Sequence, residues 1–187
     1  MNHVMIDLET LGTGADAVIL SIAAVRFDPH TPHTFEGFPE LEFYRTGINI
    51  ETQAGGVITD STLRWWLKQS DAARAEHLKE TGSLHQALMD LNRFMHREKV
   101  QGVWGNGADF DNAILQQAWQ RFQMGGQLYP FWANRCFRTF MALFDPDKSH
   151  RPASNDHNAL NDCRNQIRWM WNVTRELDKP DIRGVSL

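Results

Sequence analysis

Two acidic residues stand one residue apart in an otherwise apolar stretch near the N-terminus. The stretch is VMIDLETLG, residues 4–12, and the acids are Asp7 and Glu9. Because side chains alternate between the two faces of a strand, both carboxylates would lie side by side on one face. Burying two repelling carboxylates without a partner is costly. A lysine or arginine could neutralise them, and so could a hard divalent cation such as Mg²⁺ or Mn²⁺, which prefers oxygen ligands.

Two later segments carry residues that suit the same chemistry. Asp111 follows a glycine-rich strand end in VWGNGADFDNAIL, at the predicted start of a helix. Strand ends that face helix starts are where α/β sheets build sites. His157 and Asp162 stand five residues apart in NDHNALNDC. On an ideal helix they would lie roughly 140° apart, so we expect His157 in the loop or first turn and Asp162 on the helix proper.

The elements that must position these residues change character along the chain. The opening predicts a meander of antiparallel strands over residues 3–9, 17–28 and 41–50. Helical patterns follow over residues 61–80, with Ser61 as N-cap and a break near Ser70, and over 83–98. The remaining elements are a short buried strand in 99–107, a helix over 111–123, a strand running into a helix over 134–144, and a long last helix over 157–178. Strands followed by alternating helices and strands predict an α/β domain with a mixed central sheet.

Length and composition favour one domain. The 187 residues are 42% hydrophobic, which suits a single core, so we expect one domain over 1–187 with a short C-terminal tail at 180–187. We find no apolar run long enough for a membrane span and no signal peptide, and we expect a cytoplasmic protein with two free cysteines. The net charge of −4 argues against a broad basic face that coats nucleic acid. It leaves room for an enzyme that meets phosphates in one local, metal-bearing cleft.

Three segments together resemble a known family. IDLET, NGADFDNAIL and HNALND are similar, in order and spacing, to the three motifs of the DEDDh, or DnaQ-like, 3′–5′ exonucleases. STLRWWLKQSDAARA and FRTFMALF resemble the branch that holds phage exonuclease A, exonuclease VIII-like proteins and a mycobacterial 3′–5′ exoribonuclease. The resemblance implies a ribonuclease H-like fold with a five-stranded mixed sheet flanked by helices. It implies removal of nucleoside 5′-monophosphates from the 3′ end of single-stranded DNA or RNA.

The resemblance also implies roles for individual residues. Asp7, Glu9, Asp111 and Asp162 would hold two Mg²⁺ or Mn²⁺ ions, and His157 would be the general base. Asp109 competes with Asp111, but the family places its ligand directly after an aromatic residue, as in Phe110–Asp111. We therefore expect Asp109 to be a solvated or capping acid.

Seven residues near the motifs are candidates for contacting substrate: Thr10, Leu11, Trp65, Trp66, Asn106, Phe110 and Arg138. In the family, the position of Thr10 and Leu11 lines the pocket of the terminal nucleotide. Adjacent residues on a helix point about 100° apart, so we expect either Trp65 or Trp66 in the core and the other free to stack on a base.

For the other three candidates a structural role stands beside the functional one. Phe110 packs either in the nucleotide pocket or in the core, Asn106 either binds substrate or caps a strand end, and Arg138 either holds a phosphate or forms an ion pair. Five histidines without supporting ligand patterns are expected to be solvated, namely His30, His33, His77, His85 and His96. The Trp169–Met170–Trp171 triplet is expected in the core or at a subunit interface, which permits a homodimer.

Two other functions stay open at this point. One is a catalytically idle protein of the same fold that binds nucleic-acid ends, and the other is a phosphoesterase acting on a small nucleotide. The presence of all five predicted site residues argues against the idle protein. DNA and RNA cannot be told apart, because that choice depends on contacts to the 2′-hydroxyl.

Overall fold

A computed structural model describes residues 1–30, 41–77, 79, 81–96, 99–152 and 157–177. At its centre is one five-stranded sheet with the strand order β3-β2-β1-β4-β5. The strands are β1 (His3–Thr10), β2 (Ile19–Phe27), β3 (Phe43–Gly47), β4 (Gly102–Gly105) and β5 (Asn134–Cys136). β2 is antiparallel to β1 and β3, whereas β4 is parallel to β1 and β5. The predicted mixed sheet that opens with an antiparallel meander is confirmed.

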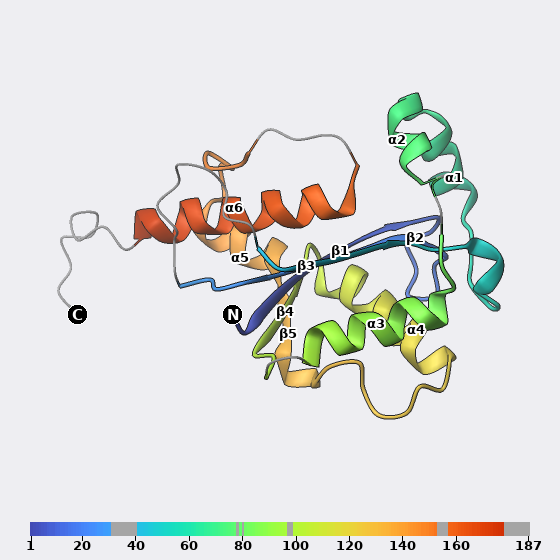
Figure 1. The fold of residues 1–187 in the computed structure, drawn as a ribbon. Coiled ribbons are helices and arrows are strands. Elements are labelled where there is room, and N and C mark those ends of the chain that lie inside the picture. Colours follow the sequence, from blue (N-terminus) through green and yellow to red (C-terminus); the bar gives the residue numbers. More distant parts are fainter. Residues whose placement is uncertain (31–40, 78, 80, 97–98, 153–156, 178–187) are drawn as a thin grey trace.

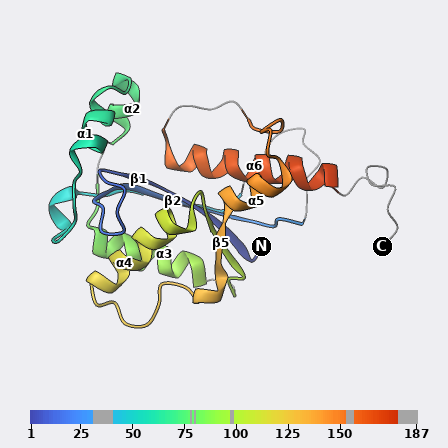
Figure 2. The same cartoon turned by 180° about the vertical axis from the view of Figure 1, so that it is seen from behind.

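Helices cover both faces of this sheet (Figure 1). The described helices are α1 (Asp60–Leu67), α2 (Asp71–Glu76), α3 (Leu84–His96), α4 (Ala113–Arg121), α5 (Phe137–Phe144) and α6 (Ala159–Leu177), of which α1 and α2 lie beyond one end of the sheet in Figure 1. Figure 2, seen from behind, also shows α3 and α4 on one face and α5 and α6 on the other. Short turns η1 (Ile50–Thr52), η2 (Ala108–Asn112) and η3 (Phe131–Ala133) complete the described elements.

The segment predicted as one interrupted helix over 61–80 is two helices. The break falls where expected, and the Ser70 side chain accepts a hydrogen bond from the Ala73 N–H at the start of α2. The prediction that Ser61 is the N-cap of α1 is wrong, because the helix begins at Asp60 and Thr59 holds the cap position. The hydroxyl of Thr59 bonds that of Thr62 instead of a backbone N–H.

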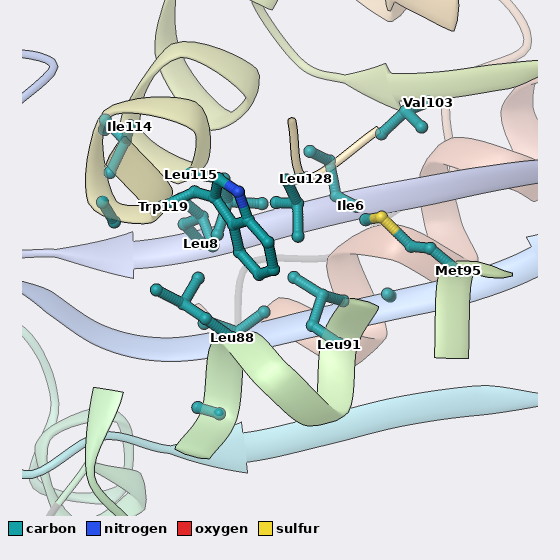
Figure 3. Packing of buried hydrophobic residues seen from close by; sticks show 14 of the residues in the cluster. Ile6, Leu8, Leu88, Leu91, Met95, Val103, Ile114, Leu115, Trp119 and Leu128 are labelled. Atoms are coloured by element: carbon teal, nitrogen blue, oxygen red, sulfur yellow. The ribbon is translucent and has the colours of Figure 1, made fainter. Parts of the chain in front are cut away.

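Alternation along β1 divides the core between the two faces of the sheet. Val4, Ile6 and Leu8 pack with α3 and α4, in the cluster around Leu88, Leu91 and Trp119 that Figure 3 shows. Met5 points to the opposite face and packs with α5 and α6. Burying each such side chain stabilises the fold by about 1.5–3 kcal/mol. The alternation therefore holds Asp7 and Glu9 on the α6 face of the sheet.

The predicted long last helix is present and packs along the sheet. Met170 and Trp171 are fully buried, and the Trp171 indole N–H donates to the Asp28 carbonyl. The core placement of these two residues is confirmed, while the homodimer stays a prediction. One domain over 1–187 also stays a prediction, and the tail at 180–187 lies outside the described residues. Among the described helices, none is both long and apolar enough to cross a membrane.

Candidate active site

Three carboxylates converge where β1 passes under the start of α6. Oxygen atoms of Asp7, Glu9 and Asp162 all lie within 4.8 Å of one another. Asp162 lies in the first turn of α6, and Gln166 follows it one turn later on the same helix. The amide Nε2 of Gln166 donates to Asp7 Oδ1 at 2.9 Å. This bond fixes the Asp7 carboxylate relative to α6.

A fourth carboxylate, Asp111, is almost fully buried beside β1. Its exposed fraction is 2%, and its Oδ1 accepts the Leu8 N–H at 3.1 Å. Asp111 belongs to the π-helical turn η2 that precedes α4, a geometry frequent at functional sites. A Cβ atom on Gly105 would lie 2.9 Å from the Asp111 Cβ and 2.2 Å from Asn112 Oδ1. The glycine at the end of β4 therefore permits the approach of Asp111 to β1.

Burial raises the pKa of Asp7 and of Asp111, and repulsion by the neighbouring acids adds to this effect at Asp7. Desolvation raises the pKa of Asp111 to about 7, although hydrogen bonds from the Leu8 and Asn106 backbone act in the other direction. Desolvation, followed by the charges of Asp111, Glu9 and Asp162, raises the pKa of Asp7 well above its ordinary range. Full ionisation of the cluster is thus unfavourable without an added positive charge.

The donor set suits a hard divalent cation. All its ligand atoms are carboxylate oxygens, which Mg²⁺, Mn²⁺ and Ca²⁺ prefer. Among the described residues, the ion pairs of lysines and arginines involve neither Asp7 nor Asp111. The acidic cluster can therefore bind a metal ion, and a cation there would neutralise the repulsion.

His157 stands directly before α6, outside the helix, as the spacing indicated. Its φ of 46° is in the left-handed region, so neighbouring contacts must hold it there. The edge of its ring meets the Trp65 ring at a centroid distance of 4.9 Å. The next residue, Asn158, accepts the Asn161 N–H through Oδ1 and donates through Nδ2 to Glu76 on α2. Residues on α1 and α2 therefore anchor the segment that presents His157.

Two cavities flank the carboxylates. One has a volume of about 220 Å³ and is lined by residues that include Asp7, His157 and Asp162. We call the second, of about 390 Å³, the terminal pocket; Glu9, Thr10, Trp65, Trp66 and Phe110 are among its lining residues. The cluster thus lies at the junction of two hollows, so a chain-like substrate could cross it.

Comparison with known proteins decides the family. The sequence model described as "3'-5' exoribonuclease Rv2179c-like domain" matches residues 2–174. The chain belongs to this family. The match contains all five residues predicted to carry the chemistry.

Individual relatives of this family member include nucleases. The chain is 31% identical over 121 residues to the exodeoxyribonuclease of Enterobacteria phage T4, with 59% of the chain and 52% of that protein covered. Its fold is similar to that of E. coli exonuclease I in complex with a dT13 oligonucleotide, at a TM-score of 0.58 and 14% identity, with 94% of this chain and 42% of that chain covered. A full-length 3'-exonuclease aligns at a TM-score of 0.50 and 13% identity, with 93% and 81% covered. The chain thus spans about half the length of the phage relative and of exonuclease I, and the structural matches support the ribonuclease H-like fold.

The two tryptophans of this family member divide as predicted. Trp66 is 6% exposed and donates its indole N–H to the Thr10 carbonyl at 2.8 Å. Trp65 is 42% exposed and borders the terminal pocket next to His157. Trp65 is therefore the one available for stacking on a base.

Of the other five candidates for contacting substrate, three line the two cavities beside the carboxylate cluster and two do not. Thr10 and Phe110 line the terminal pocket, and Asn106 lines the cavity of Asp7. Leu11 is instead buried against Val18 and Trp66. Arg138 is exposed and donates to the Asn106 carbonyl at 2.6 Å, bordering a third cavity. The backbone of Leu11 accepts the Thr59 N–H, so it supports the pocket without lining it.

The prediction that Asp109 is solvated and the prediction that five histidines are solvated have different outcomes. Asp109 is exposed, as expected for a solvated acid. The solvated placement of His77 is wrong, because its ring packs on Trp66 at 4.7 Å and its Nε2 is buried without a hydrogen-bond partner among the described residues. Burial lowers its pKa. Of the other histidines, His30, His85 and His96 are exposed, and His33 lies outside the described residues.

Sequence reasoning missed Gln166 and the Glu76–Asn158 bond. Gln166 had a usable signal, since it stands four residues after Asp162 on the same helical face. The Glu76–Asn158 bond joins residues 82 positions apart and had no local signal.

Proposed function

We propose that this chain is a metal-dependent 3′–5′ exonuclease that releases nucleoside 5′-monophosphates from the end of a single strand. The observation that carries the proposal is the cluster of Asp7, Glu9 and Asp162 at the junction of two cavities, with His157 beside it. The family description and the phage T4 exodeoxyribonuclease support it.

Four acids would hold the metal. Asp7, Glu9 and Asp162 offer oxygens at one point, and Asp111 lies beside β1 next to them. Two bound Mg²⁺ or Mn²⁺ ions would supply Lewis-acid chemistry, lowering the pKa of water and stabilising charge on the phosphate. Gln166 would orient Asp7 for this task, since its donated bond occupies one carboxylate oxygen.

His157 would accept the proton of the attacking water. An imidazole titrates near neutral pH and can serve as a general base there. The Trp65 ring and the Asn158–Glu76 bond would keep the imidazole over the cavity that Asp7 and Asp162 line. The terminal nucleotide would occupy the terminal pocket, with its base against Trp65 or Phe110.

A ladder assay tests this function. A 5′-labelled single strand is incubated with Mn²⁺, as matched DNA and RNA, and the products are resolved by length. The proposal expects products shortened stepwise from the 3′ end, and the comparison of the two strands measures the DNA or RNA preference. Asp7→Asn should abolish the ladder, whereas Asp109→Asn, which changes an exposed acid nearby, should not.

Other outcomes would support the alternatives. Binding of the strand without any product would indicate an idle end-binding protein. Cleavage confined to dinucleotides would indicate a small-nucleotide phosphoesterase.

A further inference from the structure

A third cavity continues from the cavity that holds Asp7 and His157. It has a volume of about 370 Å³ and shares Asn106, Phe137, Arg151 and Trp169 with that neighbour. We define the basic groove as the part of this cavity lined by Arg138, Lys148, Arg151, Phe137, Met141 and Trp169.

The basic groove concentrates positive charge on a chain whose net charge is −4. Its three cations, Arg138, Lys148 and Arg151, form no ion pair among the described residues. The guanidinium of Arg151 lies 5.7 Å from the centre of the Trp169 ring, which holds it at the junction with the neighbouring cavity. An anion entering the groove would therefore meet three cations, of which Arg138 also interacts with the charge of Asp111.

The acid that also borders this cavity is already engaged. Asp145 accepts hydrogen bonds from the Ser149 hydroxyl, from the His150 N–H and from the Trp169 indole. These bonds close the turn that carries Lys148 and tie it to α6. Asp145 therefore shapes the groove, and since these bonds keep it ionised, the cavity sets three cations against one carboxylate.

The cavities follow one another across the molecule. Glu9 of the carboxylate cluster borders the terminal pocket, and Asp7 and Asp162 border the next cavity. That cavity leads through Asn106, Phe137, Arg151 and Trp169 to the basic groove. A strand with its 3′ nucleotide in the terminal pocket and its phosphate at the cluster would reach the groove with its upstream nucleotides.

We propose that the basic groove binds the upstream backbone of the single-stranded substrate, an inference that rests on the proposed nuclease function. Phosphates would meet Arg138, Lys148 and Arg151, and bases would pack on the apolar wall of Phe137, Met141 and Trp169. A cationic groove with an apolar wall is how proteins bind single strands without reading sequence. The groove would make the enzyme prefer strands that extend beyond the dinucleotide.

The test compares two charge variants of the full chain. The groove variant is Lys148→Asn. Arg138 is left intact because its charge acts on the pKa of Asp111, and Arg151 because it also lines the cavity that holds Asp7 and His157. The matched control is Lys99→Asn, which removes the same charge from an exposed position outside the groove. Binding of a labelled strand of about twelve nucleotides is followed by fluorescence anisotropy in Ca²⁺, and Mn²⁺-dependent turnover is measured on that strand and on a dinucleotide.

The inference predicts a length-dependent defect. The groove variant should bind the longer strand about threefold more weakly, and the salt slope of log K should fall by about 0.7 for the one lost phosphate contact. Its kcat/KM on the dinucleotide should stay near that of the unmodified chain, and the control should match the unmodified chain on both substrates.

Several results would overturn the inference. These are unchanged strand binding by the groove variant, an equal loss on both substrate lengths, an equal loss in the control, or failure of the unmodified chain to bind the strand. Competition by polyglutamate as strong as that by the strand would assign the groove to an acidic protein segment. If the unmodified chain turns over neither substrate but its strand binding still depends on the groove, the proposed function fails and the groove assignment stands.

Discussion

Replacing Asp111 by asparagine should remove the contribution of this acid to the pH dependence of stability in the metal-free protein. The pKa of this acid is about 7 in the folded state against 3.8 for the ordinary side chain. Between these two pKa values the folded state keeps a proton that the unfolded chain has released. Asp111 therefore contributes stability that is present at low pH and is lost as pH rises through about 4 to 7. At about 1.4 kcal/mol per unit, ionising Asp111 in the fold costs about 4 kcal/mol.

Asparagine keeps the oxygen that accepts the Leu8 N–H but carries no charge. Lost contacts of the second oxygen lower the stability of Asp111→Asn by an amount that does not vary with pH. The difference in free energy of unfolding between variant and unmodified chain should move in favour of the variant by about 2 kcal/mol from about pH 5 to about pH 7. Comparing the two chains at each pH cancels the contributions of histidines such as His77.

Urea denaturation in EDTA at both pH values measures this difference. Asp109→Asn is the control, because it removes an exposed carboxylate two residues away. Adding Mn²⁺ at about pH 7 should stabilise the unmodified chain more than Asp111→Asn, since binding to the folded state stabilises it. Parallel pH dependence of Asp111→Asn and the unmodified chain would refute the electrostatic reasoning about this acid.

Four further substitutions probe the site around the cluster. His157→Ala should lower kcat by about 10²-fold or more while Mn²⁺ affinity, measured by calorimetry, stays near its original value; equal losses of both would contradict the role of a base. Trp66→Ala should lower the free energy of unfolding in urea by about 3–5 kcal/mol, because this side chain is buried. Trp65→Ala should leave that free energy nearly unchanged and raise KM, and a core-like loss of stability would show that the ring is structural. Glu76→Ala should lower kcat, since it removes the acceptor of the Asn158 bond beside His157, and should also lower the urea midpoint, since the same carboxylate pairs with Arg45 and Lys79; unchanged kcat would show that this bond does not position the histidine.

Much of the fold was predictable because local patterns and tertiary packing agree. β1 alternates Val4, Ile6 and Leu8 with Met5 and Asp7, and its two faces pack against different helices in the structure. The same alternation placed Asp7 and Glu9 together. Because the alternation of side chains along β1 determines its local structure, the relative positions of Asp7 and Glu9 could be predicted from the sequence.

Other features depend on contacts that no local pattern contains. His77 has the sequence surroundings of a surface histidine, but α2 brings it onto Trp66. Ser61 is a good N-cap residue, yet α1 begins one residue before it. The anchoring of Asn158 by Glu76 needs two distant segments to meet, so it becomes visible only in the folded chain.

We propose that divalent cations bound among the carboxylates of Asp7, Glu9 and Asp162 allow these acids to lie together. Anomalous X-ray scattering from crystals of the protein soaked in Mn²⁺ would locate the ions. We expect manganese peaks within coordination distance of these oxygens, close to Asp111. If no manganese is found there and the acids are instead bonded to a lysine or arginine, the cluster is not a metal site.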